Sequence, residues 1–348
     1  MSHSAASQVH YIPVREDWLA RHSEPALDLD LPIIDPHHHL WDRPGWRYLL
    51  PELLADMGQG HNIVATIFVQ CRAMHRAEGP EEFRPVGETE FVNGIAAMSA
   101  SGIYGPTKIA AGIVGHANLM LGARVREVLE AHIRAGGGRF RGIRHISAWD
   151  PDPVLMNPAY QPPRDMLHRP EFREGFAQLA PLGLSFDAWL YHPQIPDLTA
   201  LARAFPETQI VLDHVGGPLG IRDYAGRRDE VFADWRAAMA ELATCPNVSV
   251  KLGGLGMRIN GMGFEEAADP PSSDTLAAAW KPWIDTTIGL FGANRCMFES
   301  NFPVDKGSYG YGVFWNACKK LAAGASAAER SALFSGTAAR VYRLESAI

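Results

Sequence analysis

The sequence has no long apolar run, no basic block and few cysteines. Its 348 residues carry 32 Lys and Arg against 39 Asp and Glu, which gives a net charge of −7. Without clustered positive charge, nucleic acid and anionic membranes are poor partners. No apolar stretch approaches the ~20 residues that cross a bilayer, and the first thirty residues contain no apolar signal-peptide core. We therefore expect a cytoplasmic protein whose partner is a small-molecule substrate.

The cysteine pattern excludes a disulfide framework and a cysteine metal site. The four cysteines are scattered and form no CxxC pair, so we expect free, buried thiols in a reducing compartment; they are Cys71, Cys245, Cys296 and Cys318. Hydrophobic residues make up 47% of the chain and charged residues 20%. This composition supports a large core and excludes a disordered chain.

Short apolar runs alternate with amphipathic segments along most of the chain. The runs predict buried parallel strands, at residues 33–37, 63–71, 108–114, 140–146, 184–191, 209–215, 248–252 and 296–301. Helical spacing is expected at 51–57, 88–100, 121–135, 171–182, 197–205, 229–244, 276–291, 326–334 and 338–344. Eight such alternations favour an α/β fold, a single-domain (β/α)8 barrel over residues 31–348 with an N-terminal extension at 1–30. An open doubly wound sheet is the alternative, but the first crossover lacks GxGxxG.

Two histidines end the first predicted strand. In Asp35-Pro36-His37-His38-His39, His37 and His39 point to the same face, because side chains two apart on a strand do so. Catalytic residues of barrels lie at the carboxyl ends of the strands. Two neutral imidazoles there can hold a divalent metal or polarise a carbonyl. A polar strand end whose histidines only satisfy nearby backbone groups is the alternative.

The ends of two later strands carry side chains that could take part in catalysis or metal binding. His214 lies in Leu212-Asp213-His214-Val215-Gly216-Gly217-Pro218, where an apolar strand meets a glycine-rich turn. Glu299 and Asn301 end the last strand on one face, with Glu299 deeper by ~6.7 Å. A buried carboxylate is costly unless it is paired or used. Glu299 is therefore either a site residue or part of an internal ion pair with Lys251 or Arg144.

Further polar side chains at strand ends are candidates for substrate binding, namely Gln70, Arg144, Tyr191, His192 and Lys251. The cationic pair Arg144 and Lys251 suits a substrate carboxylate. Two long connections rich in Pro, Gly and Asn, 147–168 and 253–273, follow strand ends and are expected to cover the substrate.

Together these motifs resemble the amidohydrolase-related family. The resemblance rests on D-x-H-x-H after strand one, Gly-Ile-Arg-His in strand four, LDHVGGP after strand six, SNFP after strand eight and the closing Ala-Ala-Arg-Val-Tyr-Arg-Leu. The branch it resembles is lactonase-like and includes L-fuconolactonase and pyrone-dicarboxylate lactonase. The resemblance implies a TIM-barrel hydrolase of small lactones, with His37, His39 and His214 as catalytic residues and, when a metal is present, as its ligands.

One position departs from the family pattern. The family carries S-D-x-P at strand eight, whereas this chain has Asn301 in place of the aspartate. A carboxamide cannot act as a base at neutral pH and is a poorer metal ligand. Either Glu299 supplies the carboxylate, or a histidine or metal-bound hydroxide replaces it, or hydrolysis is lost. Strand four offers Arg144 and His145 in place of a carboxylated lysine, so any metal site is mononuclear.

Three functions therefore stand at this stage. The first is a lactone hydrolase that uses one divalent ion such as Zn²⁺ or Mn²⁺, or none, with Glu299 as proton acceptor and Asn301 orienting the water or substrate. The second is a metal-dependent, non-oxidative decarboxylase of an aromatic or unsaturated acid. The third is a ligand-binding barrel without catalysis. A homo-oligomer is also considered, because Tyr11, Ile12 and Trp18 of the N-terminal extension suit packing across a subunit.

Overall fold

The computed structural model describes residues 11–344, and its centre is a parallel barrel. Eight strands follow one another in chain order around the sheet. They are β1 (Ile33–His38), β4 (Ile63–Val69), β5 (Lys108–Gly115), β6 (Phe140–Arg144), β7 (Ser185–Ala188), β8 (Ile210–Leu212), β9 (Val248–Leu252) and β10 (Cys296–Phe298). A parallel bridge between His38 and Phe302 brings the last strand back to the first. The predicted (β/α)8 barrel is confirmed.

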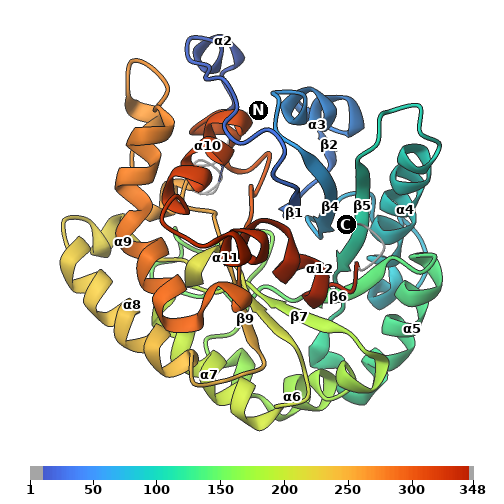
Figure 1. Ribbon diagram of the computed structural model, residues 1–348. Helices are drawn as coiled ribbons and strands as arrows, with labels where there is room; N and C mark the ends of the chain where they lie inside the picture. Colours follow the sequence, from blue (N-terminus) through green and yellow to red (C-terminus); the bar gives the residue numbers. More distant parts are fainter. Residues whose placement is uncertain (1–10, 345–348) are drawn as a thin grey trace.

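Helices surround the barrel (Figure 1). The outer ring contains α3 (Leu50–Met57), α4 (Val86–Ala100), α5 (Val125–Ala135), α6 (Pro170–Phe176), α7 (Ile195–Ala204), α8 (Arg228–Leu242), α9 (Ser273–Phe291) and α10 (Tyr311–Leu321). The proline at the start of α6 and the side chain of Ser272, which caps α9, explain where these helices begin. Among residues 11–344, no helix is long and apolar enough to span a membrane.

The C-terminal helices close one end of the barrel. In Figure 1, α11 (Ala327–Ser331) and α12 (Thr337–Val341) lie across its centre. Apolar side chains from the strands, among them Ile34, Ile67 and Met297, form one buried cluster with Tyr342 and Leu344. With this end filled, the opening at the carboxyl ends of the strands is left for a ligand.

Several elements differ from the sequence predictions. The strands after β5 mostly end earlier than predicted, because their polar last residues leave the sheet and form loops; His214 and Asn301 even have positive φ angles, 55° and 56°. The hairpin of β2 (Trp41–Arg43) and β3 (Trp46–Tyr48) was not predicted. Helix α10 was also missed, because nine of its eleven residues are buried and no polar face marks it. The prediction of four free, buried cysteines is confirmed.

The N-terminal extension lies against its own barrel over residues 11–30. It contains one short helix, α2 (Glu16–Leu19), and buries Ile12 and Trp18. Glu24 accepts hydrogen bonds from the backbone and hydroxyl of Ser273 at the start of α9. These contacts lie within one chain, whereas packing across a subunit remains a prediction.

Candidate active site

Three histidine rings meet at the open end of the barrel. His37 comes from β1, His39 follows that strand directly, and His214 comes from the turn after β8. The ring of His37 lies 4.9 Å from that of His39 and 4.6 Å from that of His214, centroid to centroid. The chain after β9 passes so close to the His214 ring that position 254 requires glycine, because a Cβ added to Gly254 would lie 2.4 Å from that ring. The sequence therefore predicted this group of side chains correctly as neighbours.

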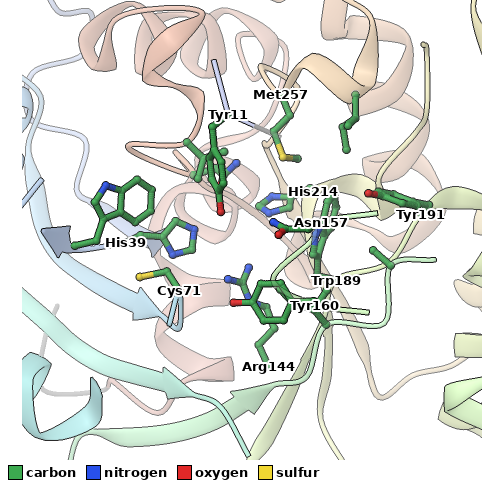
Figure 2. A pocket seen from close by; sticks show the side chains of 16 residues that line it. Tyr11, His39, Cys71, Arg144, Asn157, Tyr160, Trp189, Tyr191, His214 and Met257 are labelled. Atoms are coloured by element: carbon green, nitrogen blue, oxygen red, sulfur yellow. The ribbon is translucent and has the colours of Figure 1, made fainter. Parts of the chain in front are cut away.

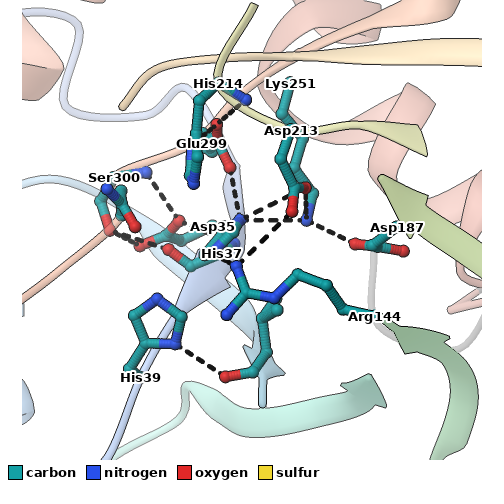
Figure 3. A network of polar contacts seen from close by, with 12 residues as sticks. Asp35, His37, His39, Arg144, Asp187, Asp213, His214, Lys251, Glu299 and Ser300 are labelled. Carbon is teal, nitrogen blue, oxygen red and sulfur yellow. Dashed lines mark hydrogen bonds and ion pairs between the residues drawn. The ribbon is translucent and has the colours of Figure 1, made fainter. Parts of the chain in front are cut away.

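Glu299 lies between two of these histidines (Figure 3). The backbone N–H and Nδ1–H of His214 donate to its Oε1 over 3.0 Å and 2.7 Å, and its Oε2 lies 2.7 Å from Nδ1 of His37. Burial disfavours the charged carboxylate, but the adjacent imidazoles of His214 and His37 outweigh it and lower the pKa of Glu299 to about 2. The hydrogen bond also fixes the tautomer of His214, so its Nε2 carries a lone pair.

The alternative ion pair of Glu299 with Lys251 or Arg144 is wrong. Lys251 is fully buried, and its Nζ lies 2.7 Å from Asp187 Oδ2 and 3.1 Å from Asp213 Oδ1. Burial opposes the ammonium charge, but these two carboxylates outweigh it and raise the pKa of Lys251. The ammonium group predicted to bind substrate is thus already held by two carboxylates below the pocket.

His37 and His39 are both neutral. Burial, and then the charge of Lys251, lower the pKa of His37 to about 4. Burial is the main cause that lowers the pKa of His39 well below its usual value, and repulsion between the protonated rings of His37 and His39 and from the Arg144 guanidinium adds to it. Nδ1–H of His39 donates to the carbonyl of Val69 over 2.7 Å, which leaves Nε2 with a free lone pair. At neutral pH Nε2 of His39 can bind a metal or accept a hydrogen bond, whereas Nδ1 of His37 already lies 3.2 Å from Lys251 Nζ and its Nε2 lies 3.3 Å from Arg144 Nη1.

Asn301 presents an oxygen to the pocket. Its Nδ2 donates to Asp305 Oδ1 over 2.9 Å. Asp305 also accepts hydrogen bonds from the backbone of Gly256 and the hydroxyl of Tyr309. Because the amide nitrogen is committed to Asp305, the carbonyl oxygen of Asn301 is left to face the pocket that this residue lines. Asn301 is therefore suited to accept a hydrogen bond from a substrate hydroxyl or a water.

A pocket opens above these residues (Figure 2). Its polar lining includes His39, Arg144, His214 and Asn301, and its walls combine tyrosine and tryptophan rings with aliphatic side chains. The guanidinium of Arg144 donates to the backbone carbonyl of Gln70, and Nη1 lies 3.3 Å from Nε2 of His37. Nε of Arg144 makes no hydrogen bond within the described residues. Its Nη1 also lies 3.6 Å from Asp213 Oδ2, but Arg144, unlike Lys251, lines the pocket and can meet a substrate anion.

The other predicted substrate-binding residues differ in position. Tyr191 lines the pocket, and its hydroxyl donates to the carbonyl of Leu155. Gln70 is buried behind the pocket and accepts a hydrogen bond from the hydroxyl of Tyr160 over 3.1 Å. His192 does not line the pocket: its ring lies 5.4 Å from that of Tyr224, and its Nδ1 accepts from the backbone of Leu219.

The two long loops that were predicted to cover the substrate, 147–168 and 253–273, contribute Asn157, Tyr160, Met257 and Ile259 to the pocket lining. Lining side chains that the sequence did not single out for the pocket include Tyr11, Trp41, Trp189 and Val304. Trp189 stands edge-on to His214 with ring centroids 4.7 Å apart, and its position at the end of a predicted strand was a usable signal. Tyr11 lies far from every motif and carried no such signal.

The chemistry of the buried cluster fits one divalent cation. His37, His214 and Glu299 each offer a ligand atom, and these atoms lie within 4.8 Å of one another. Oε2 of Glu299 is buried and makes no hydrogen bond to any described residue, although it lies 2.7 Å from Nδ1 of His37. Two imidazoles and a carboxylate are a usual ligand set for Zn²⁺. The sequence predicted His37, His39 and His214 as the metal ligands. In the structure the three-residue cluster consists of His37, His214 and Glu299.

Fold and site together define a TIM-barrel hydrolase with a histidine–carboxylate centre. The amidohydrolase family model matches residues 34–344, so the chain belongs to the amidohydrolase family. It is 34% identical over 337 residues to the uncharacterized protein y4mH of Sinorhizobium fredii, covering 90% of this chain and 99% of that protein. It is 30% identical over 326 residues to an L-fucono-1,5-lactonase of Burkholderia multivorans, covering 89% and 96%. A zinc-bound amidohydrolase structure from Burkholderia multivorans superposes with a TM-score of 0.69 at 27% identity, covering 90% and 99%.

Proposed function

We propose that the protein hydrolyses a small lactone that carries hydroxyl or carboxylate groups. The observation that supports this most strongly is the His214–Glu299 pair at the base of a pocket with aromatic walls. Aromatic faces suit the apolar C–H face of a small ring, and a few convergent polar groups fix its orientation. The similarity to L-fucono-1,5-lactonases at 27–30% identity supports the same reaction class.

The reaction begins with water attacking the ring carbonyl. His214 lines the pocket and its Nε2 has a lone pair, so in the metal-free chain it takes the proton of the attacking water and returns it to the ring oxygen as the ring C–O bond breaks. Glu299 aligns this ring and stabilises its charged form through Nδ1–H. The sequence analysis predicted Glu299 itself as the proton acceptor. The geometry favours His214, because Glu299 is fully buried and both of its oxygens lie against imidazoles.

Substrate orientation follows from the remaining polar groups of the pocket. Asn301 accepts a hydrogen bond from a substrate hydroxyl, and Arg144 binds a carboxylate or an oxygen of the ring. A divalent ion held by His37, His214 and Glu299 would supply a Lewis acid for the carbonyl and would lower the pKa of a bound water.

Proton release from a panel of sugar, muconate and pyrone lactones tests this proposal. We expect turnover by the wild-type protein and a loss of at least ~10²-fold in His214→Ala. His168→Ala is the matched control, because His168 is 46% exposed in its side chain and pairs with Asp197 away from the pocket. If the wild type hydrolyses no lactone but releases carbon dioxide from benzoates or muconates, its reaction is decarboxylation and the proposal of hydrolysis is wrong. Tight binding without turnover across both panels would identify a binding protein.

A further inference from the structure

The N-terminal segment lies against loops that follow the last two barrel strands. Ile12 is 3% exposed and packs on the loop after β10, where a Cβ added to Gly307 would lie 2.6 Å from it. Only glycine fits beneath Ile12 without displacing it. We call residues 11–24 the N-terminal strap.

The strap is also bound to the loop after β9. The indole N–H of Trp18 donates to the carbonyls of Ala267 and Ala268, each over 3.1 Å. The guanidinium of Arg15 donates to the carbonyl of Glu265 and lies 4.3 Å from the Trp18 ring centroid. The strap therefore has fixed contacts to the β9 and β10 loops, both of which border the pocket.

These contacts place Tyr11 in the wall of the active-site pocket (Figure 2). Its ring stands edge-on to Trp46 at 5.5 Å and to Trp41 at 6.3 Å. Trp41 in turn stacks on His39 with centroids 5.8 Å apart. In Figure 2 the hydroxyl of Tyr11 points into the space between His39 and His214.

We propose that Tyr11 contacts the substrate and determines which lactone is accepted. This inference rests on the proposed lactone hydrolysis and adds a residue from outside the barrel to its substrate-binding wall. The ring covers one face of the substrate, and the hydroxyl forms a hydrogen bond with a substrate oxygen on the side opposite Arg144. The proton-accepting pair His214 and Glu299 is untouched by the strap, so the effect falls on binding and selectivity.

The test compares Tyr11→Ala, Tyr11→Phe and Arg15→Ala on two lactones that differ in one hydroxyl group. We expect Tyr11→Ala to raise KM about tenfold, equivalent to ~1.4 kcal/mol, with kcat within about threefold of wild type. Tyr11→Phe should bring the kcat/KM values of the two lactones closer together, because it removes the hydroxyl group and keeps the ring that forms the pocket wall. Arg15→Ala should also raise KM, because it loosens the strap without altering the pocket lining. Tyr104→Ala, a tyrosine 40% exposed on the far loop before β5, is the matched control.

Binding of a lactam isostere, measured by calorimetry, separates this inference from the proposed function. If the wild type hydrolyses lactones and Tyr11→Ala matches it in KM and selectivity, the role of Tyr11 is refuted while lactone hydrolysis stands. If Tyr11→Ala lowers kcat and leaves KM unchanged, the role in binding is also refuted. If the wild type neither hydrolyses a lactone nor binds the lactam, both proposals are wrong.

Discussion

Replacing Glu299 with glutamine should weaken both the fold and the reaction. The substitution keeps the size of the side chain but removes the charge that lies against His37 and His214. A neutral amide can accept the Nδ1–H of His214, but it cannot stabilise a positive charge on that ring. Hydrolysis is expected to fall by ~10²–10⁴-fold, the usual effect of disabling a positioned acid–base group.

The effect on stability can be calculated from the pKa of Glu299. Its pKa is lowered from 4.5 to about 2, and each pKa unit corresponds to ~1.36 kcal/mol, so the carboxylate contributes about 3 kcal/mol at neutral pH. A lowered carboxyl pKa stabilises the fold above pH 4.5, and this contribution is lost as the pH falls through about 2. At pH 3 about half of it should remain. Breaking a buried ion pair usually costs a similar ~3–5 kcal/mol.

Urea unfolding at pH 7 and pH 3 is the assay. Glu241→Gln is the control, since Glu241 is 59% exposed in its side chain and pairs with Arg203 at the surface; its effect should stay within ~0.5 kcal/mol. The reasoning is refuted if Glu299→Gln unfolds at the same urea concentration as Glu241→Gln at pH 7. A difference of equal size at both pH values would show that lost packing, rather than lost charge, causes it.

Three further predictions concern the amide, the metal and pH. Asn301→Asp should place a carboxyl about 3 Å from Asp305, so that the two groups share a proton. Infrared titration should then show one of the two carboxyls protonated at pH 7, and two ionised carboxylates would contradict this. Metal analysis after loading with Zn²⁺ should find at most one ion per chain, and Glu299→Gln should weaken its binding about 10–100-fold; unchanged affinity would exclude Glu299 as a ligand. Burial lowers the pKa of His37, His61 and His116 to about 4, and these histidines outnumber the carboxyls of Glu88 and Asp305, whose pKa burial raises to about 6. Stability should therefore increase as the pH rises from 4 to 6.5, and a thermal unfolding series showing a decrease would contradict it.

The sequence predicted the barrel and its central residues because both follow from local patterns. Continuous apolar runs define the strands, and His37, His39 and His214 stand where those runs end. Tyr11 could not be predicted in the same way, since its position depends on contacts of the strap with loops some 250 to 300 residues later in the chain. The orientation of Asn301 was equally hidden, because it is set by Asp305 through a hydrogen bond that strand spacing does not reveal.

The charge state of Lys251 illustrates a further limit of sequence analysis. A lysine at a strand end suggests an anchor for a substrate anion, but Asp187 and Asp213 already surround its ammonium group. Tyr342, which directly follows α12, donates a hydrogen bond to the same Asp187. Which partner a buried charge chooses is decided by three-dimensional distances, and these were not available from residue order.

The position of Glu299 bears on how enzyme loss is inferred in this family. Scored by the S-D-x-P pattern that the family resemblance implies, the chain lacks the aspartate, because Asn301 stands at that position. Measured in space, a carboxylate still lies within 2.7 Å of His37 and His214, supplied by a residue two positions earlier. A survey that scores catalytic competence by that pattern alone would discard this chain, although a buried carboxylate lies against two imidazoles. A search for any carboxylate within reach of the paired imidazoles would retain it.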